Sequence, residues 1–234
     1  MRSGSHQKAL DYYKNIPEKQ QAFVQEFHRS HSQKKISING LTWNYFDSDT
    51  PDDALMLLHG GFADFSMWIH QIIEFEQYFR VIAPTCPNLP LATMKAYSEG
   101  LEAILMAEKV EKINLMGYSE GGLIAKCFLR EQPSLINKII LAHIFFPSHE
   151  NKYYKYDFNL FRTLPAPITE MIFRILAKPD KEELHPTNSE WLAWFKAYFA
   201  ELKSTLTKEK ILSHIDLMID FSRNYAFHPD DLST

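Results

Sequence analysis

The sequence contains little cysteine and no long apolar run, and both shortages exclude classes of protein. Cys86 and Cys127 are the only cysteines among 234 residues, too few for a disulfide framework, so we expect a reducing, cytoplasmic compartment. No apolar run approaches the roughly twenty residues that span a bilayer. The first residues also lack the apolar core of a signal peptide. The sequence therefore predicts no membrane span.

Charge and motif content exclude further classes. The chain carries 25 Lys and Arg residues against 29 Asp and Glu residues, a formal net charge of −4, with both signs mixed along its length. No basic stripe is present that would bind nucleic acid. Metal-ligand spacings, phosphate loops and dinucleotide fingerprints are also missing from the sequence. We therefore expect no metal, no cofactor and no nucleic-acid partner, and a small molecule as the substrate.

What the sequence does contain is a series of short apolar runs. The first two are separated by Asn39-Gly40, a hairpin signal. Helix-like segments lie between the later runs, at roughly residues 92–109 and 121–131. These later runs are DALMLLHG, FRVIAP, KINLMGYS and KIILAHIFF. Continuous apolar strands that alternate with helices predict an α/β fold, with a mainly parallel sheet and helices on both faces.

The pattern of the chain changes along its length and predicts four parts. Residues 1–33 are expected to form an N-terminal helical extension, and residues 34–146 the α/β core. Residues 147–215 are aromatic-rich, helical and interrupted by prolines, which favours a cap or lid. Residues 216–234 are expected to form a helix and a turn that return toward the core. The aromatic side chains of the cap have two interpretations, core packing or the lining of an apolar substrate pocket.

The motif with the most definite chemistry is Gly-Tyr-Ser-Glu-Gly at residues 117–121. It lies between an apolar strand and a helix, so a sharp turn would lift the Ser119 hydroxyl out of the backbone as a nucleophile. Gly117 and Gly121 would keep such a crowded turn free of side-chain clashes. The amide of Glu120 would then lie at a helix N-terminus, where it can donate to an oxyanion. A tight turn that merely carries a serine is the alternative.

A second glycine-rich turn ends an earlier strand. Because ligand sites in parallel sheets lie at the carboxyl ends of the strands, this turn and the serine turn are expected at one edge. We predict that the amide of Gly61 is the second oxyanion donor, with Phe62 as the next choice. His59 begins this turn and is interpreted as a brace that hydrogen-bonds the loop, with the role of base as the less favoured alternative.

The two motifs, in this order along the chain, resemble those of the α/β-hydrolase family. The resemblance rests on LLHGGFADFSMW as oxyanion loop, FRVIAPTCPNLP as strand-four turn, INLMGYSEGG as nucleophile elbow and NKIILAHI as sixth strand. At the strand-four turn, Cys86 stands where an aspartate is common. The resemblance implies an α/β-hydrolase fold with a helical cap. It also implies hydrolysis of an ester, thioester or amide-type bond in a small, apolar molecule, through an acylated Ser119.

The resemblance leaves the acid and the histidine of a catalytic triad unassigned. In the family's order the acid and the histidine follow the nucleophile, after strands seven and eight. The sequence ends at Leu-Ser-Thr without such strands, so it resembles a family member that is truncated at its C-terminus. Two candidate bases remain. His143 ends the predicted sixth strand, and His228 precedes a Pro-Asp-Asp turn.

Two functions therefore stay open from the sequence. The first is a serine hydrolase, impaired if the chain lacks its acid and histidine. The second is a non-catalytic protein that binds a small ligand on the same scaffold. A sixth strand without further neighbours would be an exposed sheet edge. A homodimer through that edge and a longer natural chain are the two expected ways of covering it.

Overall fold

The computed structural model describes residues 11–50, 53–88, 92–144, 159–176 and 189–226. The chain divides into two compact units. One unit combines Met1–Ser32 with Pro165–Lys208, and the other combines Gln33–Leu164 with Glu209–Thr234.

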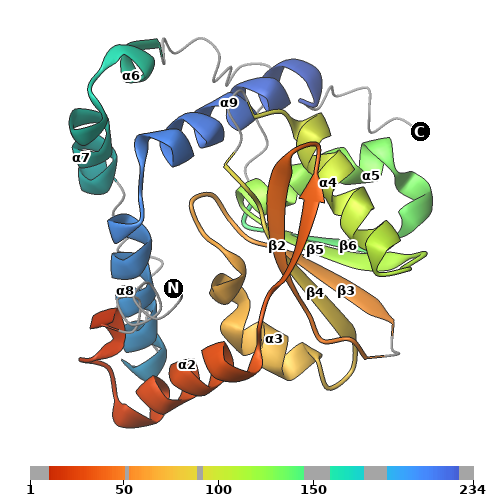
Figure 1. The fold of residues 1–234 in the computed structure, drawn as a ribbon, viewed down its shortest axis with the longest axis horizontal. Helices are drawn as coiled ribbons and strands as arrows, with labels where there is room; N and C mark the ends of the chain where they lie inside the picture. Colours follow the sequence, from red (N-terminus) through yellow and green to blue (C-terminus); the bar gives the residue numbers. More distant parts are fainter. Residues whose placement is uncertain (1–10, 51–52, 89–91, 145–158, 177–188, 227–234) are drawn as a thin grey trace. The chain divides into compact units, whose positions relative to one another are not determined.

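The second unit contains one six-stranded sheet with the strand order β1-β2-β4-β3-β5-β6 (Figure 1). The first two neighbouring pairs in that order are antiparallel, and the remaining three pairs are parallel. The strands are β1 (Lys34–Ile38), β2 (Leu41–Asp47), β3 (Ala54–Leu58), β4 (Arg80–Thr85), β5 (Ile113–Tyr118) and β6 (Ile136–Ala142). The prediction of a mainly parallel α/β sheet is confirmed.

The turn between β1 and β2 follows from its two residues. Asn39 and Gly40 have φ angles of 50° and 79°, both in the left-handed region. Glycine and asparagine adopt this region at low cost, and a two-residue hairpin turn requires it at both positions. The hairpin that Asn39-Gly40 predicts is therefore confirmed by the antiparallel pairing of the two strands.

Helices cover the sheet and bury its apolar side chains. The helices of this unit are η2 (Phe65–Trp68), α3 (Ile69–Phe75), α4 (Met94–Ala107), α5 (Glu120–Glu131), η3 (Pro133–Leu135), α6 (Asn159–Thr163) and α9 (Lys208–Asn224). Every residue of β3 is buried, as expected for a continuous apolar strand with neighbours on both sides. The main core joins strand residues such as Met56 and Leu115 to Leu101 of α4, Phe128 of α5 and Phe221 of α9.

The first unit is helical. Its elements are η1 (Asp11–Tyr13), α2 (Glu18–Ser30), α7 (Ala166–Leu176) and α8 (Ser189–Ser204). The hydroxyl of Tyr13 donates to Glu201 of α8 at 2.8 Å. Trp194 and Tyr198 are buried with stacked rings, 5.3 Å between centroids. These two aromatic residues pack in a core, the first of the two interpretations for the aromatic residues of this region.

The predicted division of the chain into four parts stays a prediction. Its boundary between residues 215 and 216 falls inside α9, which continues without a break from Lys208 to Asn224. Among the described residues, β6 pairs with β5 alone. Neither the homodimer nor the longer chain is tested by that pairing. In the part of the chain that the structure describes, no helix has the length and apolar character needed to cross a bilayer.

Candidate active site

Ser119 is the single residue between the end of β5 and the start of α5. Its φ of 51° and ψ of −119° are unusual for a residue with a side chain and cost free energy. Two hydrogen bonds hold this conformation. The Ser119 amide donates to the carbonyl of Ala142 in β6 at 3.0 Å, and the Ser119 carbonyl accepts from the amide of Gly122 at 2.9 Å. The result is a sharp strand-to-helix turn that displays a half-buried serine.

The glycines on both sides of Ser119 are required by close backbone contacts. A Cβ atom at Gly117 would lie 2.4 Å from the carbonyl oxygen of Gly121. A Cβ atom at Gly121 would lie 2.4 Å from the carbonyl oxygens of both Leu58 and His59. Backbone atoms cannot rotate away from such contacts, so only glycine allows α5 to begin directly against the end of β3.

We expect Gly121→Ala to lower the free energy of unfolding by about 3 kcal/mol, because the added methyl group meets fixed carbonyl oxygens. Gly122→Ala is the matched control. Its added methyl group meets a methyl of Ile144, a side chain that can change rotamer, and comes no closer than 3.3 Å to the backbone oxygen of Gly117, so the loss should stay below about 1 kcal/mol. Urea unfolding of both variants measures the difference. Equal losses in the two variants would contradict this account of the turn.

The turn after β3 is braced by His59. Its side chain is buried, and its Nε2 accepts a hydrogen bond from the amide of Cys86 at 3.0 Å. Nδ1 is therefore the protonated nitrogen, and it donates to the carbonyl of Gly60 at 2.7 Å. Burial lowers the pKa of His59, so the ring stays neutral. Both ring nitrogens are occupied, as expected for a residue that holds a loop in place.

The loop after His59 lies against the serine turn. A Cβ atom at Gly60 would lie 3.1 Å from the ring of Tyr118 and 3.6 Å from the Cβ of Ser119. Phe62 has a φ of 64°, again in the left-handed region. The structure thus brings the loop that carries two of the predicted oxyanion donors next to the predicted nucleophile. The third predicted donor is the amide of Glu120. Glu120 is the first residue of α5, so its amide has no acceptor within that helix.

Of the two candidate bases, His143 and His228, the structure describes only His143. His143 directly follows β6, is exposed and stacks on Tyr118, with 5.5 Å between ring centroids. His228 lies outside the described residues. Among the residues that are described, no hydrogen bond joins the Ser119 hydroxyl to a histidine. The choice of base therefore stays a prediction.

His214 of α9 is a neighbour of this site that the sequence did not indicate. Its Nδ1 pairs with the buried carboxylate of Glu120, and its ring lies 4.6 Å from the ring of Phe62. Burial opposes the charge of His214, but the Glu120 carboxylate outweighs burial and raises the pKa of the imidazole. The two residues are 94 positions apart in the chain, and no local pattern links them.

A small cavity of about 130 Å³ adjoins this pair. Its lining includes Glu120 and His214, together with Cys86, Tyr97 and Lys210. Burial raises the pKa of the Cys86 thiol, so this thiol stays protonated and is a poor nucleophile. The hydroxyl of Tyr97 donates to the carbonyl of Pro87 at 2.7 Å. The cavity is therefore lined largely by polar residues, includes Phe62 of the loop after β3 in its lining, and is large enough for only a few heavy atoms or waters.

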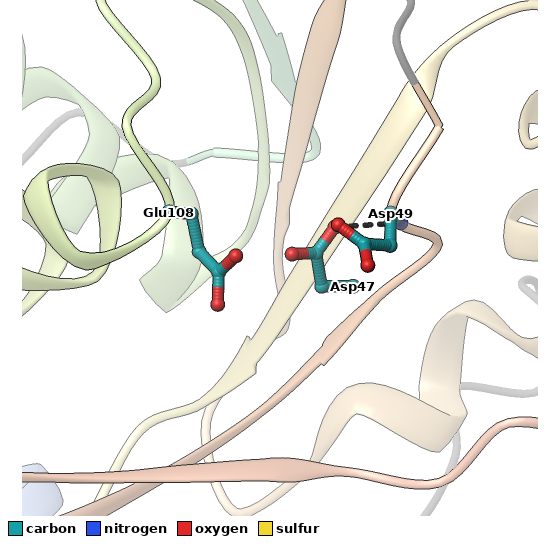
Figure 2. A group of neighbouring side chains, drawn as sticks. All are labelled: Asp47, Asp49 and Glu108. Carbon is teal, nitrogen blue, oxygen red and sulfur yellow. Dashed lines mark hydrogen bonds between the residues drawn. The ribbon is translucent and has the colours of Figure 1, made fainter.

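A group of three carboxylates elsewhere in this unit has the composition of a metal site. Figure 2 shows Asp47, Asp49 and Glu108, whose oxygens lie within 4.8 Å of one another. Arg80 Nη2 donates to Asp47 at 2.7 Å and to Glu108 at 2.8 Å, and Lys34 Nζ contacts both carboxylates as well. These two cations already compensate the charges of Asp47 and Glu108, two of the three carboxylates. The group is an ion-pair network that ties β1, β2, β4 and the end of α4 together.

Residues 53–169, half of the chain, match a family model described as alpha/beta hydrolase fold. Epoxide hydrolase 4 of Mus musculus is 28% identical over 145 residues, 57% of this chain and 40% of that protein. An uncharacterized carboxylesterase, nap, of Bacillus subtilis is 28% identical over 123 residues, 47% of this chain and 41% of that protein. The chain spans less than half the length of these two relatives.

Solved structures resemble the chain in fold. A hydrolase from Pseudomonas aeruginosa PA01 has a TM-score of 0.61 at 16% identity, covering 84% of this chain and 74% of that one. Carboxylesterase CesB of Bacillus subtilis has a TM-score of 0.55 at 17% identity, covering 87% and 70%. At these identities the likeness concerns the arrangement of helices and strands alone.

Proposed function

Because the chain belongs to the alpha/beta hydrolase fold family, as its two glycine motifs predicted, we propose that it is a serine hydrolase. Its substrate would be an ester, thioester or amide-type bond in a small, apolar molecule. The observation that carries the proposal is the backbone of Ser119, held at a φ of 51° beside the glycine loop. Such a costly conformation persists where surrounding contacts enforce it, and it is typical of a displayed nucleophile.

In the proposed reaction, the Ser119 hydroxyl attacks the carbonyl carbon of the substrate. Its proton passes to a base and then to the leaving group, and water later hydrolyses the acyl-enzyme. The amides of Gly61 and Glu120, with Phe62 as a further donor, would stabilise the oxyanion. His143 and His228 are the candidate bases. His143 directly follows Ala142, whose carbonyl accepts the Ser119 amide, which supports the first of them.

The alternative is a small-ligand-binding protein on the same scaffold. One observation favours it: among the described residues, the Ser119 hydroxyl has no hydrogen bond to a histidine that could activate it. A serine without a base keeps only weak residual reactivity. A homodimer through the β6 edge is proposed with either function, since β6 lies at an edge of the described sheet.

Reaction with a fluorophosphonate tests the proposal, because this probe labels activated serines. Trypsin is expected to release residues 113–126, a peptide whose only serine is Ser119. We expect one adduct on the intact protein, located in this peptide, and no adduct on protein that is unfolded before treatment. No adduct at all would contradict a catalytic Ser119 and favour the binding protein, whereas an adduct on another peptide would show that another group is the nucleophile.

A further inference from the structure

The side chain of His214 lies directly on the oxyanion loop. A Cβ atom at Gly61 would come within 2.8 Å of both Nδ1 and Cε1 of the His214 ring. The same ring packs at a tilt of 43° against Phe62, with 4.6 Å between the ring centroids. The His214 ring therefore lies against both Gly61 and Phe62, although α9 is far from these residues in the sequence.

The partner of His214 belongs to the other side of the proposed oxyanion hole. Glu120 follows the nucleophile, and its amide is one of the proposed donors. Its carboxylate pairs with His214 Nδ1, and Oε2 lies 3.4 Å from the Cβ position of Gly61. A single carboxylate–imidazole pair therefore links the two backbone segments that would donate to the oxyanion.

The helix that carries His214 is firmly attached to the core of its unit. Leu217 and Phe221 are fully buried in the main core cluster. Asp220 accepts a hydrogen bond from the amide of Met94 at the start of α4, at 2.8 Å. Asp216 pairs with Arg162. His214 is thus held from a rigid element, which a positioning role requires.

The loop needs such support because its own conformation is costly. Phe62 has a φ of 64°, a region that residues with side chains rarely occupy. Oxyanion stabilisation depends on donors held in place before the charge develops. We infer that His214, paired with Glu120, is a positioning residue that fixes the amides of Gly61 and Glu120 for oxyanion binding. The inference rests on the proposed function of Ser119.

His214→Ala and His214→Asn test the inference in the full chain, with Ser222→Ala as the matched control on the same helix. We expect His214→Ala to slow fluorophosphonate labelling of Ser119. For the hydrolysis of a short-chain nitrophenyl ester, we expect kcat to fall by about 10–100-fold and KM to change less than about twofold. The asparagine amide can replace Nδ1 beside Glu120, so His214→Asn should recover most of the loss. Ser222→Ala removes only a hydrogen bond to the carbonyl of Met218 within α9 and should leave the labelling rate within about twofold.

Two outcomes would overturn the inference. One is labelling of His214→Ala within about twofold of the unchanged protein, and the other is an asparagine variant no better than the alanine variant. If the unchanged protein is not labelled at Ser119, the proposed function fails by itself. Hydrogen exchange of residues 59–63 then still decides the positioning role. We expect the amides of residues 59–63 to exchange at least about tenfold faster in His214→Ala than in the unchanged protein. Equal exchange rates would exclude the positioning role of His214.

Discussion

Replacing Ser119 with alanine is expected to lower kcat/KM for a hydrolysable ester by at least about 10⁴-fold. The variant lacks the oxygen that would form the acyl-enzyme, and the oxyanion donors alone supply only residual catalysis. Alanine keeps a Cβ atom at the same left-handed φ of 51°, so the thermal stability should change little. Initial rates with short-chain nitrophenyl esters, measured beside melting temperatures, check both expectations.

Ser98→Ala is the control for the Ser119 variant. Ser98 is a buried serine of α4, distant in sequence from both glycine turns. Its replacement should leave the ester hydrolysis rate within about twofold, because no step of the proposed reaction uses it. A Ser119→Ala protein that keeps more than about a tenth of the activity would show that another group is the nucleophile.

Arg80→Met is expected to lower the free energy of unfolding by about 3–5 kcal/mol. Arg80 donates through Nε and Nη2 to both carboxylate oxygens of Asp47, whose side chain is fully buried. Burial opposes the charge of Asp47, yet hydrogen bonds from Arg80 and Lys34 outweigh it and hold the pKa of this carboxyl well below its usual range. Removal of Arg80 leaves a buried charge without its main partner. Urea unfolding measures the loss.

Lys34→Met is the matched comparison for the arginine variant. Lys34 contacts the same two carboxylates, Asp47 at 2.8 Å and Glu108 at 3.0 Å. Its side chain is 37% exposed against 15% for Arg80, so water screens its interactions more strongly. We expect a loss of roughly 1 kcal/mol. A loss as large as that of Arg80→Met would contradict the view that burial gives the arginine its larger effect.

The sequence by itself determined the elements whose signals are local. The β1–β2 hairpin could be predicted because Asn39 and Gly40 tolerate the two left-handed conformations that its turn needs. The serine turn could be predicted because Gly117 and Gly121 are the residues that fit between crossing backbones. Apolar runs without polar interruption likewise predicted strands buried on both faces, and β3 is buried along its whole length.

Only the tertiary structure decided which distant charged groups meet. Glu120 and His214 lie 94 positions apart, and Lys34 and Glu108 lie 74 positions apart. A lone histidine on a helix face has no pattern that names its partner, because the partner depends on how α9 packs against the core. The residue types that a turn requires stand next to one another in the sequence, whereas the two members of an ion pair are brought together by the packing of whole elements. For that reason the turn that carries Ser119 could be predicted from the sequence, and the Glu120–His214 pair beside it could not.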